Sequence, residues 1–257
     1  TKVLVSLIEK FGFINTIEKL DGMFAIAAWD SLQNKLYLTR DRIGEKPLYY
    51  FLNDDFFAFG SNINSLKIFP SNQLNISTNA LKKFFKLNYI PSPLSIYENY
   101  FKLNPANIFV YDYKTKNHKI FNYWKLEKKF SFSNTNNLIS KTENIISETV
   151  KSQLISDVEV GTFLSGGVDS SLITIFSNKF VNYKLKTFTL SSGDYNFDES
   201  QKARQISEYI DAENIVCKIN KDDITKAIED IPLIYGEPFG DSSQLPAMLI
   251  SKFAKNY

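Results

Sequence analysis

The spacing of apolar and polar residues changes character about halfway along the chain. In the first half, short apolar or alternating runs are separated by turn-forming residues, which is typical of antiparallel strands. A helical repeat of apolar residues precedes these runs and comprises Val3, Leu4, Leu7 and Ile8. The sequence predicts strands at residues 23–30, 35–40, 47–51 and 56–60, with a further hairpin at 108–111 and 119–123. We therefore expect a helix followed by a meander of antiparallel strands.

The second half begins after a polar stretch, residues 131–137, which we interpret as a linker. Beyond it, apolar residues recur at three- and four-residue steps and strands alternate with helices. The predicted strands are 158–164, 185–190 and 215–219; the predicted helices are 138–154, 170–180, one from about Asp198, and 221–234. Because such alternation requires helical crossovers, the three strands should be parallel neighbours in one sheet.

These patterns predict an α/β protein with two domains, at residues 1–130 and 131–257. The second domain should be a doubly wound parallel sheet, and the first an antiparallel, layered α+β domain that precedes it.

Composition excludes several classes of protein. Hydrophobic residues make up 44% and charged residues 23% of the chain, as in globular rather than disordered proteins. A formal net charge of +2 is too small to suggest a nucleic-acid or membrane partner, and no apolar run is long enough for a membrane helix. The single cysteine excludes an internal disulfide, so we expect a cytoplasmic protein.

Two residues with reactive side chains receive no catalytic role from the sequence. His118 is the only histidine and lies in the predicted hairpin among polar residues, where a solvated position is expected. Cys217 lies inside a predicted strand and is expected in the core. No cluster of histidine and cysteine suits zinc.

The strongest chemical signal is a serine- and glycine-rich loop between a predicted strand and a predicted helix. It reads Ser165-Gly166-Gly167-Val168-Asp169-Ser170-Ser171. Adjacent glycines let backbone N–H groups approach an anion, and the amino end of the following helix favours negative charge. The serines add hydroxyl donors, and Asp169 is a candidate ligand for Mg²⁺. The lysine of a Walker-type loop is absent, which argues against transfer of a γ-phosphoryl group. The alternative is that the glycines only form a tight turn.

This loop resembles the pyrophosphate-binding loop of the PP-loop ATP pyrophosphatases. Phe163-Leu164 before it, and Gly-Glu-Pro-Phe-Gly-Asp-Ser-Ser at 236–243, resemble the glutamine-hydrolysing asparagine synthetases in particular. In the first half, residues 20–27 and 40–50 resemble the late part of the class-II glutaminase domain of that family. Residues 1–130 would then be a partial glutamine amidotransferase domain, and 131–257 a partial ATP-binding synthetase domain.

The resemblance implies an activity and a set of site residues. Family members amidate aspartate to asparagine with glutamine as the nitrogen source, through an acyl-adenylate, and release AMP and pyrophosphate. Leu164 and Leu190 would contact the nucleotide, and residues 165–171 would hold the pyrophosphate, with Asp169 on Mg²⁺. Glu237 and Asp241 are candidates for the substrate pocket; the alternative is that they cap a helix from Ser242 onward. The implied partners are ATP, aspartate and glutamine, and a homodimer is left open.

Two features of the family are missing, and the sequence leaves two alternative functions open. No residue matches the N-terminal cysteine nucleophile of the glutaminase, so no catalytic residue is assigned, and we interpret Thr1 as the result of a truncation. The second glycine-rich segment, S-G-D/E-G-x-D-E, is also missing, so we expect a fragment truncated at both ends and inactive alone. The alternatives are a related amidotransferase or β-lactam-synthetase-like ligase acting on another carboxylate, and a non-catalytic nucleotide-binding module.

Overall fold

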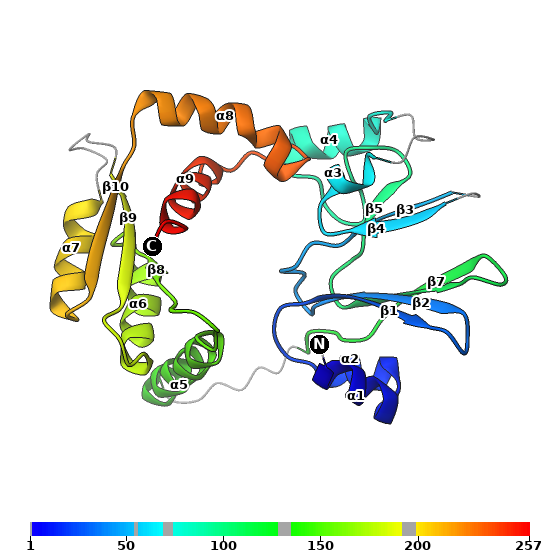
Figure 1. Cartoon of the computed structure of the whole chain (residues 1–257), viewed down its shortest axis with the longest axis horizontal. Helices are drawn as coiled ribbons and strands as arrows, with labels where there is room; N and C mark the ends of the chain where they lie inside the picture. Colours follow the sequence, from blue (N-terminus) through cyan, green and yellow to red (C-terminus); the bar gives the residue numbers. More distant parts are fainter. Residues whose placement is uncertain (1, 54–55, 69–73, 128–134, 192–198) are drawn as a thin grey trace. The chain divides into compact units, whose positions relative to one another are not determined.

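The computed structural model describes residues 2–53, 56–68, 74–127, 135–191 and 199–257 (Figure 1). The chain forms two compact units. The first contains Thr1–Lys128 together with Ile231–Gly240, and the second contains Lys129–Asp230 together with Asp241–Tyr257. The expected domain division therefore lies close to the first boundary, but the first unit also takes in ten residues from late in the chain.

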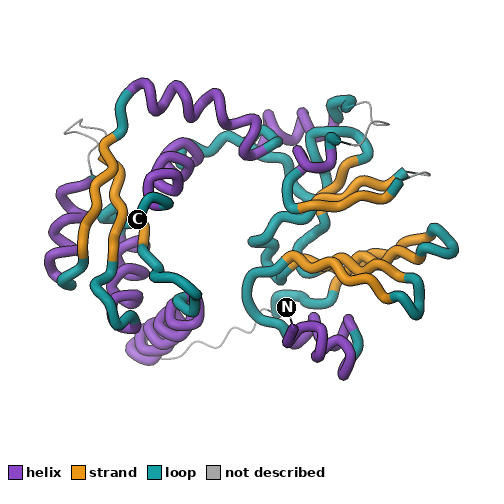
Figure 2. The backbone as a smooth tube through the Cα atoms, viewed as in Figure 1, coloured by secondary structure: helices purple, strands orange, loops and turns teal. Residues whose placement is uncertain are grey.

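Two antiparallel sheets form the body of the first unit (Figure 2). One has the order β1-β2-β6-β7 and the other β4-β3-β5. The strands are β1 (Ala25–Asp30), β2 (Lys35–Arg40), β3 (Tyr49–Leu52), β4 (Phe57–Gly60), β5 (Tyr100–Lys102), β6 (Asn107–Asp112) and β7 (Asn117–Asn122). The helices are α1 (Lys2–Phe11), α2 (Phe13–Lys19), α3 (Ile63–Leu66) and α4 (Thr78–Leu87).

Alternating side chains on these strands build three buried layers. Leu38, Tyr50 and Phe109 meet between the two sheets. On the outer face of the larger sheet, residues of β6 pack against α2, as shown by the cluster Phe13, Ile17, Ile108 and Val110. On the outer face of the smaller sheet, residues of β3 and β4 pack against α3 and α4, in the cluster Phe51, Ala58, Ile63, Leu66, Ala80, Ile90, Ile96 and Tyr100. The first unit is thus layered as helix, sheet, sheet and helix, in agreement with the predicted antiparallel layered domain.

The second unit contains a three-stranded parallel sheet of order β10-β9-β8. Its strands are β8 (Thr162–Phe163), β9 (Lys186–Ser191) and β10 (Glu213–Lys218). Its helices are α5 (Thr135–Gln153), α6 (Val168–Phe180), α7 (Ser200–Tyr209), α9 (Gln244–Ala254) and the part of α8 (Lys221–Tyr235) that precedes Ile231. Helices α7 and α9 lie on opposite sides of the sheet (Figure 1). The predicted parallel neighbours and the doubly wound α/β arrangement are confirmed.

The structure differs from the predicted elements in a few places. The strand predicted at 158–164 is reduced to two paired residues, because the N–H and C=O groups of Val160 both bond to the hydroxyl of Tyr183 instead of a neighbouring strand. The predicted first helix is present as α1, which ends at Phe11 before Gly12, whose φ of 80° is outside the helical region. Of its expected apolar face, Leu4, Leu7 and Ile8 are half-buried, whereas Val3 is 74% exposed. Helices α3 and α4 and strand β5 were not predicted.

Two other expectations concern residues around the gaps. Helix α5 begins at Thr135, so the last part of the expected linker is helical, while residues 131–134 and the helix-starting Asp198 lie outside the described residues.

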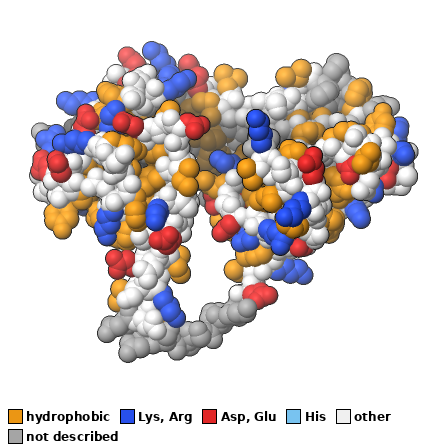
Figure 3. Space-filling model, turned by 60° about the horizontal axis from the view of Figure 1, so that its bottom comes forward, with side chains coloured by type: hydrophobic (Ala, Val, Ile, Leu, Met, Phe, Trp, Pro, Cys, Tyr) orange, Lys and Arg blue, Asp and Glu red, His pale blue; other side chains and the backbone are white. Residues whose placement is uncertain are grey.

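No helix in the described part of the chain is long and apolar enough to cross a membrane. On the face shown in Figure 3, positive and negative side chains are interspersed rather than gathered into one basic surface.

Candidate nucleotide-binding site

The serine- and glycine-rich loop joins the end of β8 to α6, as the sequence predicts. Helix α6 begins at Val168, two residues earlier than expected, and Gly167 is its N-cap residue with extended backbone angles. Asp169 therefore lies inside the first turn and is exposed. The first N–H groups of a helix have no partner within the helix, so this end of α6 presents donors to an anion.

The hydroxyl groups of the loop bond to one another and to the loop backbone. The Ser165 and Ser170 oxygens lie 3.0 Å apart, and the Gly167 N–H donates to Ser165 Oγ over 3.3 Å. The Ser170 and Ser171 hydroxyls both donate to the Gly167 carbonyl oxygen, at 3.2 and 2.6 Å. These short-range bonds hold the loop in its curved form. A phosphate group bound there would exchange hydroxyl–carbonyl bonds for hydroxyl–phosphate bonds, which are the stronger kind.

The two loop glycines differ in what they tolerate. Gly166 has a φ of +80°, and a Cβ atom there would lie 2.7 Å from Lys202 Cβ on α7. Gly167 has a φ of −74°, and the nearest atom to a Cβ there is Ser165 Oγ at 3.4 Å. Gly166 is therefore required by the packing of the loop against α7, whereas a Cβ at Gly167 would meet only the Ser165 hydroxyl, at an ordinary contact distance.

We expect Gly166→Ala and Gly167→Ala to separate folding from binding. The first should destabilise the second unit by about 1–3 kcal/mol, from backbone strain and the contact with Lys202. The second should leave the free energy of unfolding nearly unchanged and weaken binding of pyrophosphate, since its methyl group enters the space above the loop. Chemical denaturation and calorimetric titration with magnesium pyrophosphate measure the two effects. Equal losses of stability in both variants would contradict this assignment.

A buried polar network fixes Leu164, which is 1% exposed, at the carboxyl end of β8. Its N–H donates to the Phe188 carbonyl oxygen over 2.9 Å, and its carbonyl oxygen accepts from the Thr189 hydroxyl over 2.8 Å. Asn214 Nδ2 in turn donates to Thr189 Oγ1 over 3.0 Å. The bonds span β8, β9 and β10, so the whole sheet sets the position of the loop.

A pocket of about 530 Å³ lies beside the loop in the second unit. Four predicted site residues line it: Leu164, Ser165, Ser170 and Leu190. Its other lining residues, which the sequence did not predict, are Phe163, Glu199, Ile219, Ser243, Pro246, Ala247 and Ile250. Mostly apolar walls with polar groups at the loop suit a ligand with a flat apolar part and an anionic part. The carboxyl ends of parallel strands are where such sheets bind ligands.

The carboxylate of the loop suits a magnesium ion only if a phosphate ligand supplies further oxygen atoms. Among the described residues no group of three or more His, Cys, Asp or Glu side chains could hold a metal ion. Asp169 is the carboxylate in the loop itself. Because Mg²⁺ commonly binds through one or two carboxylates plus substrate phosphates and water, a single carboxylate next to an anion site is sufficient for such a role.

Neither of the two substrate-pocket candidates, Glu237 and Asp241, lines this pocket. Asp241 is exposed and its carboxylate accepts the Ser243 N–H over 2.8 Å, in the turn before α9. That hydrogen bond lowers the pKa of Asp241 below its usual value. Ser243, rather than Asp241, lines the pocket. Glu237 belongs to the first unit and has its own set of partners there, described below.

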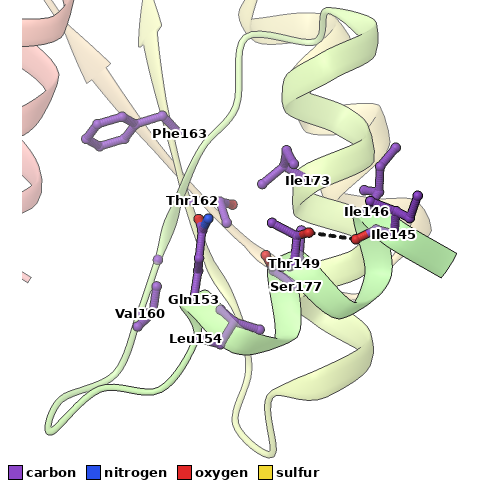
Figure 4. Close-up of a pocket in the computed structure, with 12 residues that line it drawn as sticks. Ile145, Ile146, Thr149, Gln153, Leu154, Val160, Thr162, Phe163, Ile173 and Ser177 are labelled. Carbon is purple, nitrogen blue, oxygen red and sulfur yellow. Dashed lines mark hydrogen bonds between the residues drawn. The ribbon is translucent and has the colours of Figure 1, made fainter. Parts of the chain in front are cut away.

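A second, apolar hollow of about 430 Å³ lies between α5, α6 and β8 (Figure 4). Its walls include Ile145, Ile146, Leu154, Val160 and Ile173, and it contains no charged side chain. The hydroxyl of Thr149, which also faces it, donates to the Ile145 carbonyl oxygen over 2.7 Å. The hollow therefore presents no charged group to a phosphate, and the pocket beside the loop is the better candidate for the nucleotide site.

In the first unit, a turn is built around the buried carboxylate of Asp41, which is 1% exposed. Its Oδ1 accepts the N–H groups of Gly44 and Glu45, at 2.7 and 2.9 Å, and its Oδ2 accepts those of Lys46 and Phe24, at 2.9 and 3.4 Å. Burial alone would raise the pKa of Asp41. The four N–H groups outweigh it and hold the pKa below its usual value.

The neighbouring Arg40 binds carbonyl oxygens rather than Asp41. Its guanidinium donates to the carbonyl oxygens of Gly44, Lys46 and Leu103. Arg40 thus binds carbonyl oxygens of this turn, and Asp41 binds its N–H groups. These contacts give both residues a structural role in this turn.

Comparison with known proteins matches both halves of the chain. A family model described as glutamine amidotransferase domain matches residues 1–124, and one described as asparagine synthase matches residues 141–257. A Methanocaldococcus jannaschii protein with a provisional name as a glutamine-hydrolyzing asparagine synthetase is 30% identical over 260 residues, covering 100% of this chain and 50% of its own. Asparagine synthetase (glutamine-hydrolyzing) 1 of Bacillus subtilis is 29% identical over 245 residues, covering 93% and 37%.

The chain spans half or less of the length of these relatives. Among solved structures, glutamine phosphoribosylpyrophosphate amidotransferase from B. subtilis aligns with 85% of this chain and 54% of its own, at 12% identity and a TM-score of 0.35. That similarity is too low to carry an argument. The two family models follow one another in the order of the two units, and together with the relatives they identify this chain as a member of the glutamine-hydrolysing asparagine synthetase family.

Proposed function

We propose that the second unit binds ATP and activates the side-chain carboxylate of aspartate as an acyl-adenylate, with release of pyrophosphate. Ammonia from glutamine then attacks the acyl carbon and displaces AMP, which gives asparagine. The observation that carries this proposal is the pocket lined by Leu164, Ser165, Ser170 and Leu190, at the point where a parallel strand turns into a helix. ATP bound there would supply the adenylyl group, and a Mg²⁺ ion held by Asp169 would offset negative charge on the departing pyrophosphate.

Each part of the site has a separate task in this proposal. Leu164, Leu190 and the α9 residue Pro246 form the apolar walls that hold the base and exclude water. The first N–H groups of α6 and the hydroxyls of Ser165 and Ser170 bind the pyrophosphate oxygens. These donors are fixed before the reaction, so they stabilise developing negative charge without reorganising. Asp169 would hold the magnesium ion next to the same oxygens.

We assign no nucleophile for glutamine hydrolysis to this chain. Its only cysteine, Cys217, is buried in β10, and burial raises the pKa of its thiol. We therefore propose that the 257-residue polypeptide alone does not release glutamate from glutamine. An assay of glutamate release that is positive with this polypeptide would contradict this assignment.

The test of the activity is exchange of labelled pyrophosphate into ATP by the whole enzyme, with and without aspartate. We expect exchange that requires aspartate and is not supported by glutamate. Exchange that requires a different carboxylate would replace aspartate as the substrate and keep the chemistry. Tight binding of ATP with no exchange under any carboxylate would instead favour a non-catalytic nucleotide-binding module.

A further inference from the structure

Ten residues of the chain, Ile231–Gly240, belong to the first unit although the residues on both sides of them belong to the second. We call Ile231–Gly240 the crossing segment. It includes the last turn of α8 and the first part of the loop that follows α8. That loop leads to α9, which starts at Gln244. The polypeptide thus leaves the second unit at Asp230 and returns to it at Asp241.

The carboxylate of Glu237 fastens the middle of this segment, and its side chain is only 7% exposed. Lys102 Nζ at the end of β5 lies 2.6 Å from Glu237 Oε2, and the Tyr49 hydroxyl donates to the same oxygen over 3.1 Å. The Ile96 N–H donates to Oε1 over 2.7 Å. Burial, followed by the charge of Glu237, raises the pKa of Tyr49, so this hydroxyl remains a donor. Both carboxylate oxygens are therefore held by donors of the first unit.

The start of the crossing segment is bound through its backbone. The carbonyl oxygens at the end of a helix have no partner within it. Here Asn62 Nδ2 donates to the Ile234 carbonyl oxygen over 2.9 Å, and Asn64 Nδ2 donates to those of Pro232 and Leu233, at 3.2 and 2.8 Å. The two asparagines flank the start of α3, so one short helix of the first unit caps the end of α8.

The far end of the segment is also tied to the first unit. The Gly240 N–H donates to the Asn88 carbonyl oxygen over 2.6 Å. Gly236 follows α8 with a φ of +72°, and a Cβ there would lie 2.6 Å from Ile63 Cγ2. The segment is therefore bound at its start, middle and end. The first unit thus provides a specific binding site for the Glu237 carboxylate, made of an ammonium group, a hydroxyl and an N–H group.

The point of return to the second unit lies next to the nucleotide pocket. Ser243, three residues after Gly240, lines that pocket, and so do Pro246, Ala247 and Ile250 of α9. The first residues of α9 are consequently connected to Glu237 through a short stretch of chain. Restraining that stretch restrains one wall of the pocket.

We propose that Glu237 is a positioning residue, which anchors the crossing segment in the first unit and thereby sets the α9 wall of the nucleotide pocket in the second. Its effect on nucleotide rests on the proposed function, whereas the anchoring does not. This role differs from direct contact with substrate, because the protein itself supplies the partners of both carboxylate oxygens.

The anchoring is tested by hydrogen exchange of the whole chain, followed by mass spectrometry, for Glu237→Gln, Lys102→Met and the double variant. We expect peptides that cover 231–240 and Ile96 to exchange about tenfold faster or more in each single variant. The double variant should show little further increase, because both substitutions break one interaction. Glu98→Gln, which removes an exposed carboxylate two residues from Ile96, is the matched control and should change nothing. Unchanged exchange in Glu237→Gln would overturn the proposal.

Tyr49→Phe provides a milder variant in case Glu237→Gln does not fold. It removes one of the three donors and should raise exchange in the same peptides by a smaller factor. The pocket is tested by calorimetric titration with MgATP, for which we expect Glu237→Gln to raise Kd several-fold and Glu98→Gln to leave it unchanged. Faster exchange with unchanged Kd would overturn the positioning role. If the whole enzyme without substitutions binds no MgATP, the proposed function is contradicted, and the exchange experiment alone decides whether Glu237 is the anchor.

Discussion

Asp169→Asn is expected to lower exchange of pyrophosphate into ATP by about 10²–10³-fold in the whole enzyme, with the fold intact. The substitution keeps the size and shape of the side chain and removes the charge that we assign to Mg²⁺. Asp169 lies in the first turn of α6 and is exposed, so the stability lost with its charge should be only about 0.3–1 kcal/mol. The measurements are the exchange rate as a function of magnesium concentration and the free energy of unfolding.

The matched control is Asp222→Asn. Asp222 is also an exposed carboxylate in the first turn of a helix, here α8, and is not part of the phosphate loop. It should reproduce the small stability change without any loss of exchange. If Asp169→Asn retains the parent rate and the parent dependence on magnesium, Asp169 acts only on the helix and the metal assignment is wrong.

Asp41→Asn is expected to destabilise the first unit by about 3 kcal/mol. Asparagine keeps one carbonyl oxygen for Gly44 and Glu45, but its amide group places N–H donors against the N–H groups of Lys46 and Phe24. A buried site with donors facing donors loses both hydrogen bonds and the favourable charge. Denaturant titration of the parent and the variant at pH 7 measures the difference.

The same residue should contribute to the acid sensitivity of the fold. The pKa of Asp41 is lowered in the folded protein, so its stabilising contribution is present above the unfolded-state pKa of about 3.9 and is lost as the pH falls through the folded-state pKa. The difference between parent and Asp41→Asn should therefore shrink when both are measured at progressively lower pH. Asp112→Asn is the control, because Asp112 is only half-buried and uses one oxygen to accept the Lys114 and Thr115 N–H groups, which asparagine does equally well. A difference that stays constant down to pH 2 would contradict this account.

Those parts of the fold that rest on local patterns could be predicted. The alternating pattern at 35–40 predicts a strand, and β2 occupies these residues. The structure adds that Leu38 and Tyr37 pack into different clusters, on opposite faces of β2. The loop at 165–171 was found because two glycines between an apolar strand and a helix are a local signal. Glu199 was missed as a pocket residue because it comes from a distant segment without a distinctive neighbourhood. Ser243 was missed although it ends the motif at 236–243, because the substrate-pocket candidates chosen from that motif were Glu237 and Asp241.

The position of the crossing segment could not be predicted for a similar reason. Lys102 and Glu237 are 135 residues apart, and nothing in either local sequence indicates that one will neutralise the other. Gly236 and Pro238 indicate a turn but not the surface against which the turn packs. The predicted length of the strand at 158–164 was wrong for a different reason. Its apolar residues favour a strand, but the Tyr183 hydroxyl bonds to both the N–H group and the carbonyl oxygen of Val160, which therefore do not pair with a neighbouring strand.

The crossing segment also limits how members of this family could exchange their parts during evolution or in the laboratory. A gene cut between the two halves, at the polar stretch near residue 130, would separate Lys102 from Glu237 and leave a partly buried ammonium group facing Tyr49 without its counter-charge. A chimaera that joins an amidotransferase half from one relative to a synthetase half from another would inherit the same defect unless the acidic residue and its three donors matched. Compatible halves should therefore be recognisable by the pairing of these few positions, and transplanting residues 231–240 together with the first half should rescue incompatible ones.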